Sequence, residues 1–123
     1  MKKFFLLAIS CMLLVTGCVT PMTKKEIASA KYDQLPANYQ ETLKNIIAYT
    51  LKEPNSAKYN FHKPRLAYTP ASRNVAYVVP VDVNAKNSYG GYTGYKTKYY
   101  AYTGGEYKDV TAGVRYTAVK WVD

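Results

Sequence analysis

The fold is decided by residues 75–83, VAYVVPVDV, the clearest strand pattern in the chain. Large apolar side chains occupy every second position, which is the period of one face of a β-strand: Val75, Tyr77, Val79, Val81 and Val83. Ala76 and Val78 share the other face with Asp82, so we expect the first half of the strand to be covered on both sides. Pro80 cannot donate a ladder hydrogen bond and predicts a sheet edge or a β-bulge at that point.

Upstream of this strand, residues 39–52 have the pattern of an amphipathic helix. Apolar side chains recur with helical spacing along one stripe, at Tyr39, Leu43, Ile46, Ile47 and Leu51. Asn38 and Glu41 fit a capping box at its start, and Pro54 predicts its end near Lys52. We expect this helix to pack on a sheet, and a helix that binds a partner is the alternative.

Shorter segments with a period of two predict the remaining strands, at residues 59–62, 95–102, 107–110 and 114–122. Residues 66–74 contain Pro70 and the polar run Ser72-Arg73-Asn74, and they are predicted to form a loop. The fold class is therefore α+β, with one N-terminal helix packed on a four- to five-stranded, mostly antiparallel sheet. A small, partly closed barrel is the alternative.

Composition limits the possible functions. The 123 residues include 17 Lys and Arg against 8 Asp and Glu, a net charge of +9, and 48% hydrophobic residues, which is the balance of one folding domain. The 14 tyrosines favour a sheet, because aromatic side chains suit a pleated, half-buried surface. One His and two Cys exclude most metalloenzymes and disulfide-rich scaffolds.

The N-terminus has the pattern of a cleaved export signal. A basic start is followed by a mostly apolar run over residues 4–15, too short for a membrane-spanning helix. Residues 14–18, LVTGC, resemble the bacterial lipobox, in which the cysteine, here Cys18, is lipidated and becomes the new N-terminus. We therefore expect a signal peptide at residues 1–17, a lipidated tether at 18–31 and a single domain at 32–123. The alternative for the tether is a frayed segment packed loosely on the domain, and a soluble secreted protein is the alternative to lipidation.

Cleavage would leave a mature chain with a net charge of +7 and no free thiol, because Cys11 departs with the signal and the sulfur of Cys18 joins the lipid. Several acyl chains would make membrane attachment stable. Val19 follows the cysteine in place of the Asp that retains enteric lipoproteins in the inner membrane. The expected location is the bacterial cell envelope, on the outer membrane.

The turn at residues 84–94 is the most specific candidate site. Its glycines and amides fit a long hairpin connection, which is the simpler interpretation. The same stretch offers amides and a hydroxyl for hydrogen bonding, tyrosines for stacking and lysines for an anionic group. The predicted ligand- or partner-binding residues are Asn84, Lys86, Asn87, Ser88, Tyr89, Tyr92, Tyr95, Lys96 and Tyr99.

This turn also carries a resemblance. Residues 83–94, VNAKNSYGGYTG, together with LKEPNSAKY at 51–59 and LPANY at 35–39, resemble a group of small secreted or lipid-anchored bacterial proteins of unassigned function. The similarity extends over about residues 32–102, and Glu53 stands where the group more often has Asp. The resemblance implies an exported protein with one folding unit, and it implies no activity.

Catalytic candidates are few. His62 would have to be the base of any nucleophilic triad, and its place beside Lys63 and Pro64 at a strand end favours a solvated side chain. Asp82 and Glu106 are the carboxylates near predicted turns that could act together on a glycan. We expect no catalytic activity, no metal and no cofactor, with a glycan-acting enzyme as the alternative.

The basic, tyrosine-rich strand indicates the kind of partner. Lys96 and Lys98 alternate with tyrosines, a pattern that in the cytoplasm would suggest single-stranded nucleic acid. In an exported protein we expect no nucleic acid, and instead an envelope protein or an anionic envelope glycan, with the membrane held through the N-terminal lipid. The predicted function is a small binding module, and the alternative is an inhibitory or exclusion lipoprotein that blocks a receptor or a lysozyme.

Overall fold

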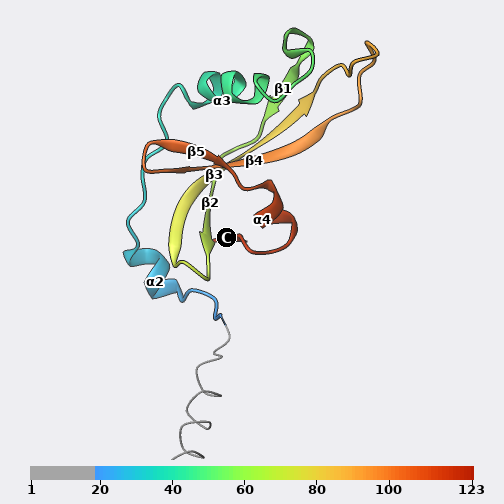
Figure 1. Ribbon diagram of the computed structural model, residues 1–123. Helices are drawn as coiled ribbons and strands as arrows, with labels where there is room; N and C mark the ends of the chain where they lie inside the picture. Colours follow the sequence, from blue (N-terminus) through green and yellow to red (C-terminus); the bar gives the residue numbers. More distant parts are fainter. Residues whose placement is uncertain (1–18) are drawn as a thin grey trace, which may run out of the picture.

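The computed structural model describes residues 19–123 and shows an α+β fold (Figure 1). The elements in chain order are α2 Lys24–Ser29, α3 Tyr39–Ala48, the 3₁₀ turn η1 Pro54–Ser56, β1 Lys58–Phe61, β2 Arg65–Thr69, β3 Asn74–Asn84, β4 Lys96–Thr103, β5 Glu106–Asp109, α4 Thr111–Arg115 and β6 Lys120–Trp121. The six strands form one antiparallel sheet. The predicted fold class is confirmed, with one more strand and more helices than expected. The sheet is not closed, so the barrel alternative is wrong.

Strand β3 is the spine of the sheet. Along one side it pairs with β4 over residues 77–83, and β4 pairs in turn with β5. Along its other side, residues 81–84 pair with β1 and residues 74–78 pair with β2, which itself pairs with β6. Two short strands therefore share one long neighbour.

The position of Pro80 follows from this sharing. Pro80 lies between the residues that pair with β1 and those that pair with β2, and its carbonyl accepts a hydrogen bond from the backbone N–H of His62 at 3.0 Å. The N–H and C=O of one strand residue point the same way, so the missing donor faces this gap and not β4. The predicted sheet edge or bulge at Pro80 is wrong, since β3 is a central strand. Pro80 does lie where the pairing along one side of β3 is interrupted, between β1 and β2.

One face of the sheet, here called the helix face, is covered by α3. Leu43 and Ile47 are fully buried against Val79, Val81 and Tyr100, with Val83 also in the cluster. Burial raises the pKa of the Tyr100 hydroxyl to about 12, and the nearby charge of Asp109 adds to the shift. The predicted packing of an amphipathic helix on a sheet is confirmed.

The ends of α3 differ from the prediction. Asn38 makes no side-chain capping bond, so the capping box with Glu41 is wrong. The reason is local geometry, because Asn38 has φ −92° and ψ 20° and not the extended conformation from which a cap reaches back. The helix ends at Ala48, before Lys52, where the N–H and hydroxyl of Thr50 both donate to the Ile47 carbonyl.

Residues 66–74 do not form the predicted loop throughout. Pro64 and Pro70 flank five residues that pair with β3 over their whole length, as strand β2. The prolines therefore mark the ends of a strand, and only the turn that contains Arg73 remains as loop.

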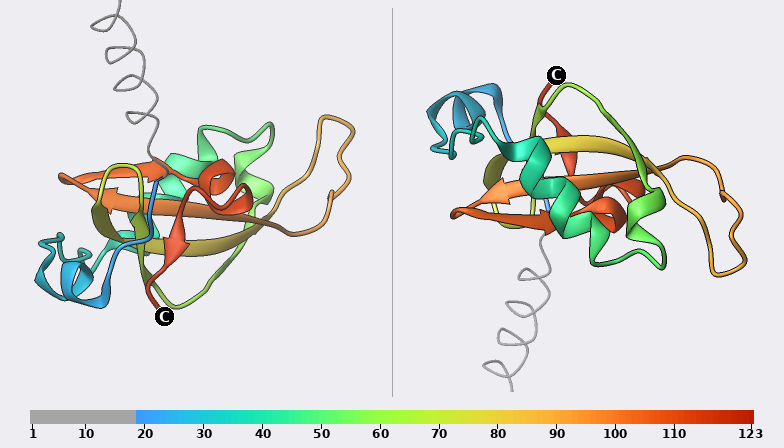
Figure 2. Two further views of the ribbon diagram at one scale, coloured as in Figure 1. Left: turned by 90° about the horizontal axis from the view of Figure 1, so that it is seen from below. Right: turned by 90° about the horizontal axis from the view of Figure 1, so that it is seen from above.

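The opposite face, here called the groove face, carries α4, and the chain then returns to the sheet as β6 beside β2 (Figure 2). The prediction of a strand over 114–122 is wrong in its first half. Asp109 Oδ1 accepts from both the N–H and the hydroxyl of Thr111, at 2.9 and 2.6 Å, which starts a helical turn. Gly113 then allows the chain to return closely past Val119, leaving two residues to pair with β2.

The segment expected to be a tether, from Val19 onward, contains a helix and touches the domain. Thr23 and Glu26 form a reciprocal capping box at the start of α2, and Met22 is only 8% exposed. Arg73, in the β2–β3 turn, donates to the Thr20 carbonyl at 3.0 Å and to its hydroxyl at 2.8 Å. Farther along, Tyr32 packs edge-on against Tyr77. The predicted signal peptide and Cys18 lie outside the described residues, and within residues 19–123 every helix is too short or too polar to cross a bilayer.

Candidate functional site

Residues 85–95, here called the hairpin arm, connect β3 to β4 and project from the end of the sheet (Figure 1). Lys86 and Tyr92 form an isolated antiparallel bridge across the arm. At its tip, the amide oxygen of Asn87 accepts from the N–H groups of Tyr89 and Gly91. At its base, the amide oxygen of Asn84 accepts from the N–H of Gly94. The predicted hairpin is confirmed, and its amide side chains stabilise its own backbone.

The arm is also fixed to the η1 turn. The N–H of Lys86 donates to the Ser56 hydroxyl at 2.9 Å, and the Tyr92 hydroxyl donates to the Ser56 carbonyl at 3.0 Å. The ammonium groups of Lys58 and Lys86 lie 4.8 and 5.5 Å from the centre of the Tyr92 ring, within cation–π range. Tyr92 therefore joins the arm to the preceding segment.

The predicted site residues fall into three groups. Asn84 at the base of the arm and Lys86, Asn87 and Tyr92 within it bond to the arm or to the η1 turn, while Ser88, Tyr89 and Tyr95 face solvent, the two tyrosines with 96% and 57% exposure. Lys96 and Tyr99 lie on opposite faces of β4, because strand side chains alternate. Only Tyr99 of the nine lines the groove described next.

A groove of about 550 Å³ opens on the groove face, between the ends of β1 and β6. We call it the Trp121 groove. Its floor is Pro80, and its walls come from strands β2, β3, β4 and β6 and from the β1–β2 corner. The lining residues are His62, Lys63, Arg65, Pro80, Asp82, Thr97, Tyr99 and Trp121.

Asp82 is the centre of the polar wall. Its Oδ1 accepts from the Thr97 hydroxyl at 2.7 Å, and its Oδ2 lies 2.7 Å from His62 Nε2 and 3.5 Å from Asn60 Nδ2. The hydrogen bond from Thr97, followed by that from His62, lowers the pKa of the Asp82 carboxyl below its ordinary value. The carboxylate is therefore ionised near neutral pH, and it holds the Thr97 and His62 side chains in place.

The opposite wall is aromatic and basic. The Arg65 guanidinium carbon lies 4.1 Å from the centre of the Trp121 ring, and its Nη2 donates to the Asp123 carbonyl at 3.3 Å. Tyr99 packs against the same indole with ring centres 5.9 Å apart. Lys63 is exposed at the rim, in the corner between β1 and β2. An indole, a phenol ring and two cations thus meet in one concave surface.

The geometry separates the groups proposed for catalysis. Asp82 pairs with Thr97 and Glu106 with Thr103, six residues farther along β4, a separation of about 20 Å at ~3.3 Å per residue. Paired glycosidase carboxylates lie roughly 5 to 9.5 Å apart. His62 Nε2 faces the Asp82 carboxylate, and the Thr97 hydroxyl donates to Asp82, not to the histidine. Among residues 19–123, no three His, Cys, Asp or Glu side chains cluster as metal ligands would.

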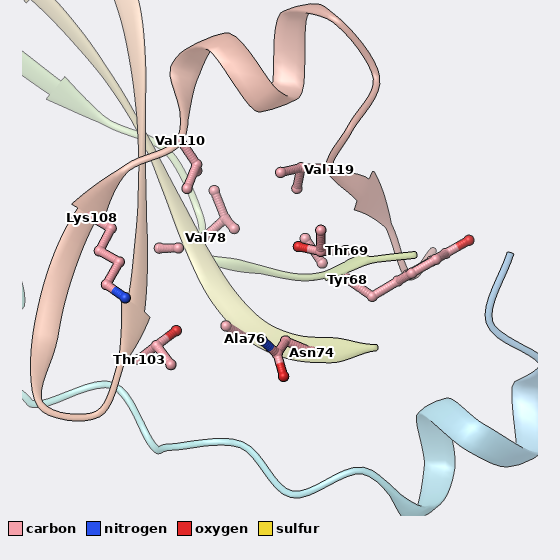
Figure 3. A pocket seen from close by; sticks show the side chains of 11 residues that line it. Tyr68, Thr69, Asn74, Ala76, Val78, Thr103, Lys108, Val110 and Val119 are labelled. Carbon is pink, nitrogen blue, oxygen red and sulfur yellow. The ribbon is translucent and has the colours of Figure 1, made fainter. Parts of the chain in front are cut away.

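A second cavity, of about 170 Å³, lies on the same face (Figure 3). Val110 and Val119 face Ala76 and Val78 of β3 across it, and Lys108 stands at one side. Its inner walls are mostly aliphatic, and it offers fewer polar groups than the Trp121 groove.

Comparison of the chain with protein-family models, with curated proteins and with solved structures gives no match. The candidate site predicted from the sequence lies in the arm and does not group Arg65 with Trp121, because residues 66–74 were predicted to be a loop and the pairing of β2 with β6 was not predicted. The sequence did contain one signal for the polar wall of the groove, the alternation of side chains along each strand. Asn60, Asp82 and Thr97 share one face of the sheet once their strands are paired.

Proposed function

We propose that this protein is a lipid-anchored binding module of the bacterial envelope, and that its Trp121 groove binds an anionic envelope glycan. The proposal depends chiefly on one observation. Arg65 and Lys63 stand beside the Trp121 and Tyr99 rings in an open groove, across from hydrogen-bonding groups already fixed by Asp82.

The two walls suit a sugar that carries a carboxylate or phosphate. Ring faces and edges of Trp121 and Tyr99 offer apolar contact for the C–H groups of a pyranose. Lys63 and Arg65 supply positive charge for the anion, while His62 and Thr97 offer polar atoms opposite them. The proposed function is binding without bond chemistry.

The anchor and the location complete the proposal. Lipidation of Cys18 would keep the groove near the membrane and raise its effective concentration toward other envelope material. Outer-membrane attachment is proposed from the residue after Cys18.

The sole tryptophan of the chain lies in the groove, so its fluorescence reports binding there. We expect soluble peptidoglycan fragments with free carboxylates, or phosphorylated lipopolysaccharide saccharides, to change Trp121 emission in a saturable way. Lys63→Gln should weaken binding about two- to five-fold, the value of one exposed ionic contact. Neutral saccharides of the same length are the ligand control.

Lys96→Gln is the matched protein control, since Lys96 is an exposed lysine on the opposite face of β4. Weaker binding in Lys96→Gln and Tyr89→Ser, with Lys63→Gln unaffected, would move the site to the hairpin arm. Saturable binding of an acidic peptide without any response to saccharides would replace the glycan with a protein partner.

A further inference from the structure

The first residues that the structure describes follow the predicted lipidation site, and they are held against the domain. Thr20 is fixed to Arg73 by two hydrogen bonds, and Glu26 Oε2 lies 3.8 Å from Arg73 Nη1. Between them, Met22 is buried. Arg73 therefore ties both Thr20 and Glu26 to the β2–β3 turn.

The contacts continue toward α3. Tyr32 packs on Tyr77 with ring centres 5.5 Å apart, and the Asp33 carboxylate accepts from the N–H of Gly104 at 2.7 Å. Gly104 belongs to the β4–β5 turn, which lies at the same end of the sheet as the β2–β3 turn. The N-terminal segment thus runs along one end of the domain and has little slack.

Chain length then limits the distance to the membrane. Thr20 is two residues beyond Cys18, and two residues span at most about 7 Å. A lipid on Cys18 would consequently bring the bilayer surface close to Arg73 and the β2–β3 turn. Lys24 and Lys25 are exposed on α2 beside this turn, and cations there are attracted to anionic headgroups.

The hairpin arm lies at the other end of the molecule. Strand β3 has 11 residues between the β2–β3 turn and the arm, about 35 Å at ~3.3 Å per residue. Figure 1 shows α2 and the arm at opposite ends of the fold. We infer that the β2–β3 end, with α2, is a membrane-contact surface for anionic lipid headgroups, and that the arm points away from the bilayer. This inference rests on the proposed lipid anchor.

Two serines allow a matched test. Ser72 lies in the β2–β3 turn and Ser88 in the arm, and both are exposed. Ser72→Cys and Ser88→Cys would each give the mature, lipidated chain a single thiol for one fluorophore. The labelled proteins would be placed in vesicles of phosphatidylethanolamine and phosphatidylglycerol that carry a nitroxide on the headgroup.

We expect the label at position 72 to be quenched several-fold more than the label at position 88. Equal quenching, or stronger quenching at position 88, in a chain that incorporates palmitate would overturn the orientation and leave the anchor standing. A chain that incorporates no palmitate and does not join vesicles would overturn the anchor and, with it, this inference.

A substitution at Arg73 tests whether the contacts of this side chain set the orientation of the domain on the membrane. Arg73 has a φ of 57°, so Arg73→Gly removes the contacts to Thr20 and Glu26 while relaxing the backbone, and the variant should fold. In this background the label at position 88 should become more strongly quenched, because the domain would turn freely on its lipid. Unchanged quenching would show that Arg73 does not set the orientation. Thr20→Val, which removes one of the two hydrogen bonds, should give a smaller change in the same direction.

Discussion

Replacing the Asp82 carboxylate with an amide tests how the Trp121 groove is built. In Asp82→Asn the side chain keeps its shape but loses its charge and one of its two acceptor oxygens, so the charge-assisted hydrogen bonds that Thr97 and His62 donate cannot both be kept. A hydrogen bond to a charged group contributes about 1.5–3 kcal/mol, and the half-exposed His62 places the loss at the lower end. We expect a destabilisation of about 1–2 kcal/mol, or about 5–10 °C in melting temperature for a domain of this size.

The pH dependence makes this prediction specific. The pKa of Asp82 is lowered in the folded state, so between that pKa and the ordinary value of about 3.9 the unfolded chain binds more protons. The contribution of Asp82 is therefore complete at neutral pH and is lost as the pH falls below about 4. Thermal unfolding followed by circular dichroism should show the wild type and the variant converging in acid.

Glu106→Gln is the control, because Glu106 is exposed and forms no ion pair with other described residues. It should change the melting temperature by less than about 2 °C. Equal stability of Asp82→Asn and wild type at pH 7, or a difference that persists unchanged to pH 2, would refute the role assigned to this carboxylate.

Three further predictions concern the body of the domain. Ile47→Ala should cost about 3 kcal/mol in urea unfolding, because Ile47 of α3 is fully buried against the sheet, and a loss below about 1 kcal/mol would contradict that packing. Gly113→Ala should cost about 1–3 kcal/mol, since its new Cβ would lie 2.9 Å from Val119 Cγ2, and an unchanged melting temperature would contradict the close approach. Tyr100 should ionise near pH 12, and the stability of the fold should decrease as the pH rises above 10, because the unfolded chain releases this proton at a lower pH than the folded chain. The measurement is an ultraviolet titration of wild type against Tyr100→Phe, and a difference between the two proteins near pH 10 would contradict the prediction.

The parts of the fold that follow from local pattern were predictable from the sequence. The alternation in residues 75–83 and the helical stripe from Tyr39 to Leu51 define β3 and α3, whose burial confirms them. The strands predicted at residues 95–102 and 107–110 imply a turn between them, and Gly104 and Gly105 adopt positive φ there.

What could not be predicted depends on tertiary pairing. β2 is short and flanked by prolines, and it forms a strand because β3 and β6 lie on either side of it. The start of α4 depends on Asp109 accepting from Thr111, a local contact that competes with the strand pattern of the valines that follow. The Trp121 groove depends on the pairing of β2 with β6, so its residues could not be grouped from spacing alone.

Pro80 has one more consequence. An N–H at this position of β3 would point into the corner between β1 and β2, where it would need a hydrogen-bond partner. Proline has no such donor, and the carbonyl of Pro80 is already occupied by the N–H of His62. This corner therefore holds a buried proline with no backbone donor to satisfy, whereas Pro80→Ala would add a buried N–H that needs a new partner.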